Sequence, residues 1–175
     1  MIRLNTLLLG HLLALVFSTV HADVFLTLEQ ARTKHWQDTS MNVVPIHFTE
    51  QQMDSIEDAS GTRVFSGKMK AWKTKTGGWF IVDQVIGKHE MIDMAVSIDH
   101  QGKIKALDVM KYVESYGDEV KHPRWLAQFT GIDSLEQLKL DHQIDNISGA
   151  TLSCRHITDG VNRWRHTWQQ VLQHL

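Results

Sequence analysis

The last nineteen residues carry an apolar stripe that constrains the fold more than any other feature of the chain. Large apolar side chains recur there at spacings of four, three, four, three and four residues: Ile157, Val161, Trp164, Trp168, Val171 and Leu175. Side chains at these spacings lie on one face of an α-helix. The C-terminal segment is therefore predicted to form a long helix, which must bury that face against an apolar surface built by the rest of the chain.

Four strand-like runs between residues 63 and 113 could supply that surface. Their residues are aromatic or β-branched, or alternate between apolar and polar types, as half-buried strands do. The turn signals Thr76-Gly77-Gly78 and Asp99-His100-Gln101-Gly102 separate two of the neighbouring pairs. The runs are Val64–Trp72, Trp79–Ile86, Met91–Ile98 and Ile104–Val113. They predict an antiparallel sheet of about four strands.

Shorter helices are predicted on both sides of these runs. Residues 27–36 show helical apolar spacing, and Thr49 with Gln52 forms a capping box at the start of a second helix. Pro123 fits the first turn of a third helix, and Ser134 is expected to begin a further helical turn. The fold class is therefore α+β: an antiparallel sheet of about four strands with helices packed on one face and a long C-terminal helix.

Residues 1–22 have the pattern of a cleaved signal peptide. Arg3 precedes an apolar stretch from Leu7 to Val20, and Val20-His21-Ala22 places compact residues where a signal peptidase reads them. An uncleaved membrane anchor is the alternative, but the stretch is shorter than the roughly 20 apolar residues of a membrane span. Residues 23–175 are then one exported, periplasmic domain.

Composition excludes several classes of function. The formal net charge is −2 and lysines and arginines do not cluster, so no nucleic-acid partner is expected. Cys154 is the only cysteine, which excludes an internal disulfide and a cysteine-based metal site. The histidines are scattered, so no metal site is expected either. Cys154 is interpreted as a buried or bystander thiol, with a redox role as the alternative.

The most informative run is Asp145-Asn146-Ile147-Ser148-Gly149-Ala150-Thr151, directly before the C-terminal helix. Gly149 and Ala150 have almost no side chain, so a ligand can approach their backbone closely. The free amides and positive dipole end of the helix favour phosphate, and Thr151 places a hydroxyl at that point. The alternative is an ordinary helix start, with Ser148 or Thr151 as a capping side chain.

This run resembles the FMN-binding domain family. The family includes flavin-carrying components of the sodium-translocating NADH:quinone reductase and of related electron-transport complexes, and the periplasmic part of nitrous-oxide-reduction regulators. Its Asp-x-x-Ser/Thr-Gly-Ala-Thr pattern matches residues 145–151 at every defined position. Gly87-Lys88, the 99–104 hairpin, Glu114-Ser115-Tyr116-Gly117 and Phe129-Thr130-Gly131 follow the family's order.

The resemblance implies FMN esterified through its phosphate to Thr151 by a separate FAD:protein FMN transferase. It implies an electron-transfer flavoprotein working with a membrane or periplasmic redox partner, with no catalytic residue of its own. The cofactor-binding residues it implies are Thr151, Ala150, Gly149, Ser148, Asp145, Glu114, Ser115 and Gly117. Asp145 is assigned to recognition by the transferase or to holding the turn.

Two other functions stay open from the sequence. One is a regulatory or sensory module that binds FMN without a covalent bond, and the other is a flavin-free exported interaction domain. The run Glu114-Ser115-Tyr116-Gly117 also departs from the family's usual Glu-Thr-Pro-Gly, which removes a proline that would stiffen the loop. Trp79 and Trp125 are candidates to flank a flavin ring, although core packing is the commoner role of tryptophan.

Overall fold

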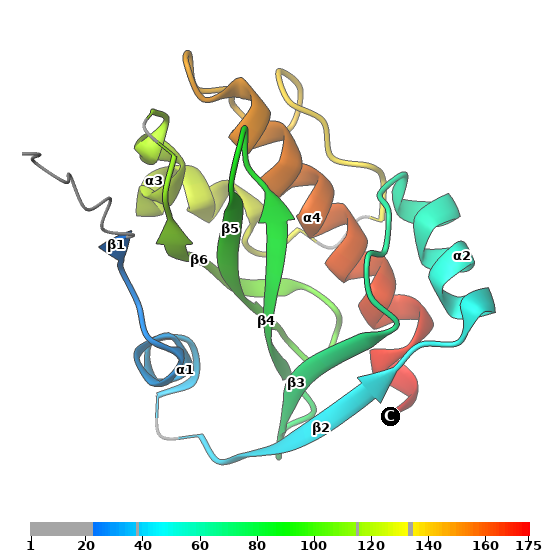
Figure 1. Cartoon of the computed structure of the whole chain (residues 1–175). Coiled ribbons are helices and arrows are strands. Elements are labelled where there is room, and N and C mark those ends of the chain that lie inside the picture. The colour runs from blue at the N-terminus through cyan, green and yellow to red at the C-terminus, as the bar shows by residue number, and fades with distance from the viewer. Residues whose placement is uncertain (1–22, 38, 115, 133–134) are drawn as a thin grey trace, which may run out of the picture.

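The computed structural model describes residues 23–37, 39–114, 116–132 and 135–175. They form a six-stranded sheet in the order β1-β6-β5-β4-β3-β2, in which every neighbouring pair is antiparallel (Figure 1). The strands are β1 (Asp23–Val24), β2 (Met41–His47), β3 (Lys68–Thr74), β4 (Trp79–Ile86), β5 (Met91–Ile98) and β6 (Ile104–Tyr112). The α-helices are α1 (Leu28–Trp36), α2 (Glu50–Ser60), α3 (Pro123–Leu126) and α4 (Thr151–Gln170).

The predicted fold class is confirmed, and four of the six strands lie close to the predicted runs. The bounds of β4 and β5 agree with the prediction residue for residue. The expected count of about four strands was too low because it omitted β1 and β2. Pro45 interrupts the strand signal of β2, but this strand lies at the edge of the sheet, where a residue without an N–H group is tolerated.

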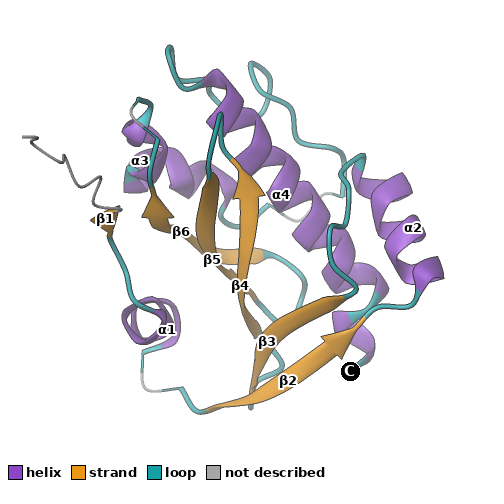
Figure 2. Cartoon of the chain, in the orientation of Figure 1, coloured by secondary structure: helices purple, strands orange, loops and turns teal. Residues whose placement is uncertain are grey.

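Helices cover both faces of the sheet, whereas the sequence predicted one covered face. Helices α2, α3 and α4 contribute Ile56, Trp125 and Trp164 to the larger apolar core. Helix α1 lies on the opposite face, where Ala31 and Trp36 join a smaller core (Figure 2). The two faces arise from strand alternation, because successive side chains of a strand point to opposite sides of the sheet.

Capping explains why the first two helices begin where they do. Thr27 and Thr49 each accept a hydrogen bond from the backbone N–H of the third helical residue, and their own N–H groups donate to Oε1 of Gln30 and Gln52. The predicted capping box of α2 is thus confirmed. Helix α2 ends at Ser60, and Gly61 follows it in the left-handed conformation that closes the last turn.

The long C-terminal helix is also confirmed. Residues Ile157, Val161 and Trp164 of α4 are fully buried in the larger core. The helix ends at Gln170 and a 3-10 turn, Leu172–His174, follows it. Helix α4 also holds the loop before it, because the Asn162 amide accepts from the N–H of Leu138 at 3.0 Å and donates to its carbonyl at 3.0 Å.

Two predictions fall on residues that lie outside the described part of the chain. These are the signal peptide, residues 1–22, and the start of the helical turn at Ser134. From residue 135 to the bridge at Leu140, the described backbone forms no helix. Within the described ranges, no helix combines the length and the apolar character that crossing a membrane requires.

Candidate functional site

Thr151 is the first residue of α4, so its hydroxyl stands at the positive end of a 20-residue helix. Gly149 has φ +86°, a conformation that glycine adopts without strain, and a Cβ at this position would meet no atom within 4 Å. Ala150 is the N-cap residue, and no described side chain caps the helix. The ordinary capping role considered for Ser148 or Thr151 is therefore wrong.

The first turn of α4 faces an open cavity of about 400 Å³. This volume lies within the roughly 300–1,000 Å³ typical of small-molecule sites. The backbone amides of residues 151–153 have no partner within the helix because they precede its first i→i−4 hydrogen bonds, which begin at Cys154. The cavity is lined by Lys88, His89, Glu114, Tyr116, Gly149, Ala150, Thr151, Leu152 and Ser153.

Side chains near α3 anchor the beginning of the 145–151 run. Trp125 Nε1 donates to the carbonyl of Asp145 at 2.7 Å, and the Asp145 N–H donates to Gln128 Oε1 at 2.9 Å. Trp125 packs edge-on against Phe129 in the core, with its ring centroid 5.2 Å away. Trp79 is 1% exposed. Neither tryptophan lines the cavity, so the structure gives both a packing role.

Glu114 follows β6 and turns its carboxylate toward the β4–β5 turn. Oε1 accepts hydrogen bonds from the backbone N–H groups of His89 at 2.6 Å and Glu90 at 3.1 Å. Burial raises the pKa of the Glu114 carboxyl, but these bonds to the ionised form outweigh burial and hold the pKa below its usual value. Glu114 is thus an ionised carboxylate fixed by backbone amides.

The loop after Glu114 closes against the first turn of α4. A Cβ on Gly117 would lie 2.7 Å from the Cβ of Ala150, so only glycine fits this contact. The Tyr112 hydroxyl donates to the carbonyl of Tyr116 at 2.7 Å. Ser115 lies outside the described residues, and its predicted contact with the cofactor stays a prediction.

The structure brings together most of the residues predicted for the site. Thr151, Ala150, Gly149 and Glu114 line the cavity, and Gly117 contacts Ala150. Ser148 and Asp145 are exposed in the same run but do not line the cavity.

Sequence reasoning missed five residues of the cavity wall: Lys88, His89, Tyr116, Leu152 and Ser153. Gly87, directly before Lys88, was the available signal, because a glycine that ends a strand often marks a close backbone approach. A Cβ on Gly87 would indeed lie 2.5 Å from Glu114 Oε1.

Cys154 lies one turn into α4 and is fully buried. Burial raises the pKa of its thiol, which favours the neutral, unreactive form despite the nearby helix N-terminus. This environment agrees with the interpretation of a buried bystander. Among the described residues, no group of three or more histidine, cysteine, aspartate or glutamate side chains could hold a metal ion.

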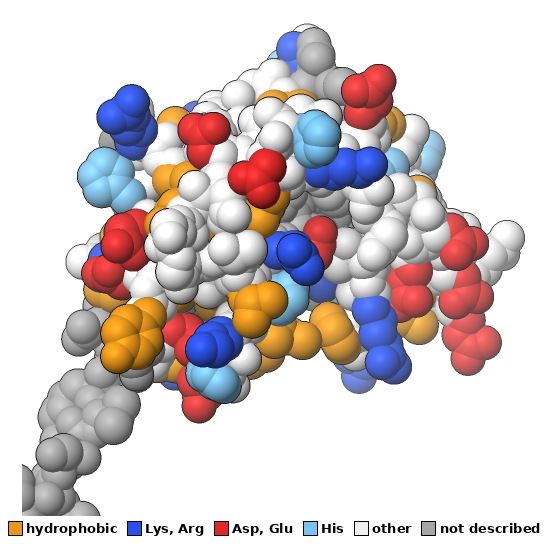
Figure 3. All heavy atoms as spheres, turned by 90° about the horizontal axis from the view of Figure 1, so that it is seen from above, with side chains coloured by type: hydrophobic (Ala, Val, Ile, Leu, Met, Phe, Trp, Pro, Cys, Tyr) orange, Lys and Arg blue, Asp and Glu red, His pale blue; other side chains and the backbone are white. Residues whose placement is uncertain are grey.

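The surface at this end of the molecule mixes both signs of charge. Figure 3 views the end that lies at the top of Figure 1, where the loop before α4 reaches solvent. Basic, acidic and histidine side chains are interspersed over most of this face, and acidic side chains gather at its right edge. Leu152 is 42% exposed and Tyr116 is 83% exposed, so apolar surface borders the cavity.

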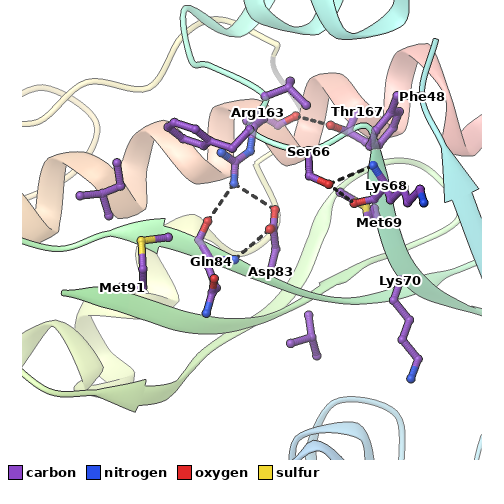
Figure 4. Close-up of a pocket in the computed structure, with 14 residues that line it drawn as sticks. Phe48, Ser66, Lys68, Met69, Lys70, Asp83, Gln84, Met91, Arg163 and Thr167 are labelled. Carbon is purple, nitrogen blue, oxygen red and sulfur yellow. Dashed lines mark hydrogen bonds and ion pairs between the residues drawn. The ribbon is translucent and has the colours of Figure 1, made fainter. Parts of the chain in front are cut away.

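A second cavity, of about 380 Å³, lies between β3 and β4 where the two strands diverge and no longer pair; we call this gap the wedge (Figure 4). Pairing between these strands ends at Ala71 and Ile81. Beyond that point, the Arg163 guanidinium donates to Asp83 Oδ2 at 2.9 Å and to the carbonyl of Gln84 at 3.1 Å. Arg163 is twelve residues after the start of α4, about 18 Å along the helix. This wedge is therefore separate from the cavity beside Thr151.

Comparison with known proteins places these features in a family context. Residues 87–166 match the model of the FMN-binding domain family. No curated protein matches the chain. Among solved structures, the crystal structure of Shewanella oneidensis NqrC is similar, with a TM-score of 0.56 and 18% sequence identity. The alignment covers 77% of this chain and 83% of that one, and at this identity it shows a shared fold. The predicted resemblance to the FMN-binding domain family is confirmed.

Proposed function

Because residues 87–166 match the FMN-binding domain family, we propose that this protein carries one FMN joined through its phosphate to Oγ1 of Thr151. The observation that carries the proposal is the position of this hydroxyl. Thr151 is the first residue of the uncapped helix α4 and lines a cavity of ligand size.

The residues around Thr151 fit a phosphate ester. The amides of residues 151–153 can donate to its oxygens, and the dipole of α4 favours its negative charge by about 0.3–1 kcal/mol at an exposed site. Gly149 and Ala150 leave room for the ester beside the backbone. No acidic residue lies in the first turn of α4 to repel it.

Formation of the ester requires FAD and a separate FMN transferase. The Thr151 oxygen forms a bond to the phosphorus on the FMN side of the FAD pyrophosphate. The bond between that phosphorus and the bridging oxygen breaks, AMP leaves with the bridging oxygen, and the hydroxyl proton is released. The exposed carboxylate of Asp145, held in place through its backbone, is available for recognition by the transferase.

The bound FMN would give the domain the capacity to accept and donate electrons. The protein fixes the position of the cofactor and exchanges electrons with a membrane or periplasmic redox partner. Export by the N-terminal segment explains the covalent bond, because a cofactor that dissociates outside the cytoplasm is lost. We assign no independent catalytic activity to the domain.

Intact-mass measurement after co-expression with an FMN transferase tests the proposal. The wild-type chain should gain the mass of one FMN minus one water. Thr151→Ala and the nearly isosteric Thr151→Val should gain nothing. Ser148→Ala is the matched control, since it removes a hydroxyl from the same run and should still load. An unmodified wild type, or a loaded Thr151→Ala variant, would overturn the proposal.

Acid precipitation distinguishes a covalent from a non-covalent flavin. The covalent account predicts that all flavin absorbance stays with the precipitated polypeptide. Release of the flavin into the supernatant would favour the non-covalent regulatory module. A colourless protein, purified beside an active transferase, would favour the flavin-free interaction domain.

A further inference from the structure

The β4–β5 turn, residues 87–90, forms one wall of the cavity and is held from two sides. On one side, Glu114 Oε1 accepts from two backbone N–H groups of the turn, those of His89 and Glu90. On the other side, His156 Nδ1 lies 3.2 Å from the carbonyl of Gly87. The turn is also closed by a hydrogen bond from the Gly87 N–H to the Glu90 carbonyl, at 2.7 Å.

The contact between Gly87 and Glu114 leaves no space for adjustment. A Cβ at position 87 would lie 2.5 Å from Glu114 Oε1 and 2.7 Å from the Glu90 carbonyl oxygen. Both distances are shorter than real Cβ contacts. The observed arrangement of the carboxylate and the turn therefore requires glycine at position 87, and a side chain there would disturb it.

His156 connects the turn to the helix that bears the hydroxyl. It is five residues after Thr151 on α4, roughly 7.5 Å along the axis. Since α4 is rigid and packed against the sheet, the hydrogen bond from His156 fixes the turn relative to Thr151. The backbone of Lys88 and His89, two residues that line the cavity, is thereby held beside the start of α4.

The cavity wall carries one ionised carboxylate, Glu114, and one lysine, Lys88. The Glu114 carboxylate accepts hydrogen bonds from backbone amides of the turn. Lys88 forms no salt bridge with any of the described residues. Lys88, without an ion pair to the described residues, thus lines a cavity that also receives the positive end of α4. Such a cavity favours a negatively charged group, and the phosphodiester of the proposed function bears one negative charge.

We propose that Lys88 is the counter-cation of the phosphate group at Thr151, and that Glu114 and His156 are positioning residues that hold Lys88 there. This inference rests on the proposed function. The inference extends the proposed function, because it adds a side-chain cation to the backbone amides of residues 151–153 as a phosphate ligand. It also gives Glu114 an indirect role, through the turn rather than through contact with the cofactor.

Titration of the unloaded protein with inorganic phosphate, followed by NMR, tests the inference without flavin. Phosphate should shift the resonances of Lys88 and of the amides of residues 151–153. Lys88→Gln should weaken phosphate binding about tenfold, as expected for loss of a charge-assisted contact. Lys75→Gln, an exposed lysine outside the cavity, is the matched control and should bind as the wild type does. Equal binding by Lys88→Gln and the wild type would overturn the role of Lys88.

Amide resonances and phosphate binding together test the positioning role of Glu114 and His156. Glu114→Gln should move the His89 and Glu90 amide resonances and weaken phosphate binding, while Lys88 is still present. His156→Gln and Gly87→Ala should have the same effect, so the test does not depend on one variant folding. Unchanged phosphate binding in all three folded variants would overturn the positioning role.

The loaded protein separates this inference from the proposed function. Its phosphorus resonance should shift in Lys88→Gln and stay unchanged in Lys75→Gln. A wild type that never gains flavin contradicts the proposed function, whatever the phosphate titration shows. A loaded wild type whose phosphorus resonance is the same in Lys88→Gln contradicts only the inference.

Discussion

Tyr112 on β6 and Ser153 on α4 form a hydrogen bond of 3.3 Å between their hydroxyl groups. The contact joins the end of the central sheet to the first turn of the helix that carries Thr151. The same tyrosine hydroxyl donates to the carbonyl of Tyr116 and so holds the loop beside the cavity. The Tyr112 hydroxyl thus connects β6, the first turn of α4 and the loop that contains Tyr116.

Tyr112→Phe should lower the free energy of unfolding by about 1–2 kcal/mol, because the Tyr116 carbonyl loses its donor and the buried Ser153 hydroxyl loses its acceptor. It should also lower the extent of flavin loading, since the 113–117 loop loses its attachment. Chemical denaturation and intact mass measure the two effects. Ser55→Ala is the matched control: it removes an exposed hydroxyl from α2, outside the cavity, and should change neither quantity. A Tyr112→Phe variant with wild-type stability would contradict the assigned role.

Gly149→Ala should reduce loading through its position beside Thr151. Its φ of +86° costs an alanine about 1–2 kcal/mol, and the added Cβ would project into the space where a ligand approaches. Gly131→Ala provides the control, because Gly131 has φ +76°, has equally free space and does not line the cavity. Both variants should lose similar stability by denaturation, but only Gly149→Ala should lose flavin. Equal loading in the two variants would contradict a ligand at Gly149.

Asp108 attaches α1 to its face of the sheet. It lies 2.9 Å from His35 Nε2 and 2.6 Å from Lys34 Nζ, and it is 7% exposed. Asp108→Ala should lower the free energy of unfolding by about 3 kcal/mol, since it leaves the buried His35 ring without its charged partner. Glu29→Ala, which breaks an exposed ion pair with Arg32, should cost less than about 1 kcal/mol. Urea denaturation at neutral pH compares the two.

The contribution of Asp108 should also depend on pH. Burial raises the pKa of its carboxyl, but hydrogen bonds from His35 and Lys34 outweigh burial and leave the pKa below its ordinary value of 3.8. Because the folded-state pKa is the lower one, the stabilisation is complete above pH 3.8 and is lost as the pH falls through the folded value. The stability difference between wild type and Asp108→Ala should therefore shrink in acid. A difference that stays constant down to pH 2 would contradict this.

Cys154 should be inert in the folded protein. Since burial raises the pKa of its thiol, a thiol-specific reagent at mildly alkaline pH should react with it only after denaturation, at one equivalent per chain. Cys154→Ala should load flavin as the wild type does. Rapid labelling of the folded protein, or loss of flavin in the variant, would restore the redox role considered for this cysteine.

Local signals in the sequence predicted most of the fold. The apolar stripe of α4, the capping box at Thr49, the β-branched and aromatic composition of β4 and the alternation in β5 depend on neighbours within a few positions. Strand β2 was missed because Pro45 is tolerated only at an edge, and the edge position is a property of the assembled sheet. The second covered face was missed for the same reason: whether α1 packs above or below the sheet depends on the chain path between them.

The site was predictable in part. Gly149, Ala150 and Thr151 are contiguous, so their common position at a helix start could be read from the run itself. Lys88 and His89 reach the cavity only because the β4–β5 turn folds back to α4, more than sixty residues later in the chain. The contact between Glu114 and this turn is equally non-local.

The central claim is the bond between FMN and Thr151, and tandem mass spectrometry of protein from its native host tests it most directly. Tryptic cleavage after Lys139 and Arg155 gives one peptide, residues 140–155, which contains the hydroxyls of Ser148, Thr151 and Ser153. We predict a peptide heavier by FMN minus water, with fragment ions that place the added mass on Thr151. An unmodified peptide, or an added mass on Ser148 or Ser153, would contradict the account.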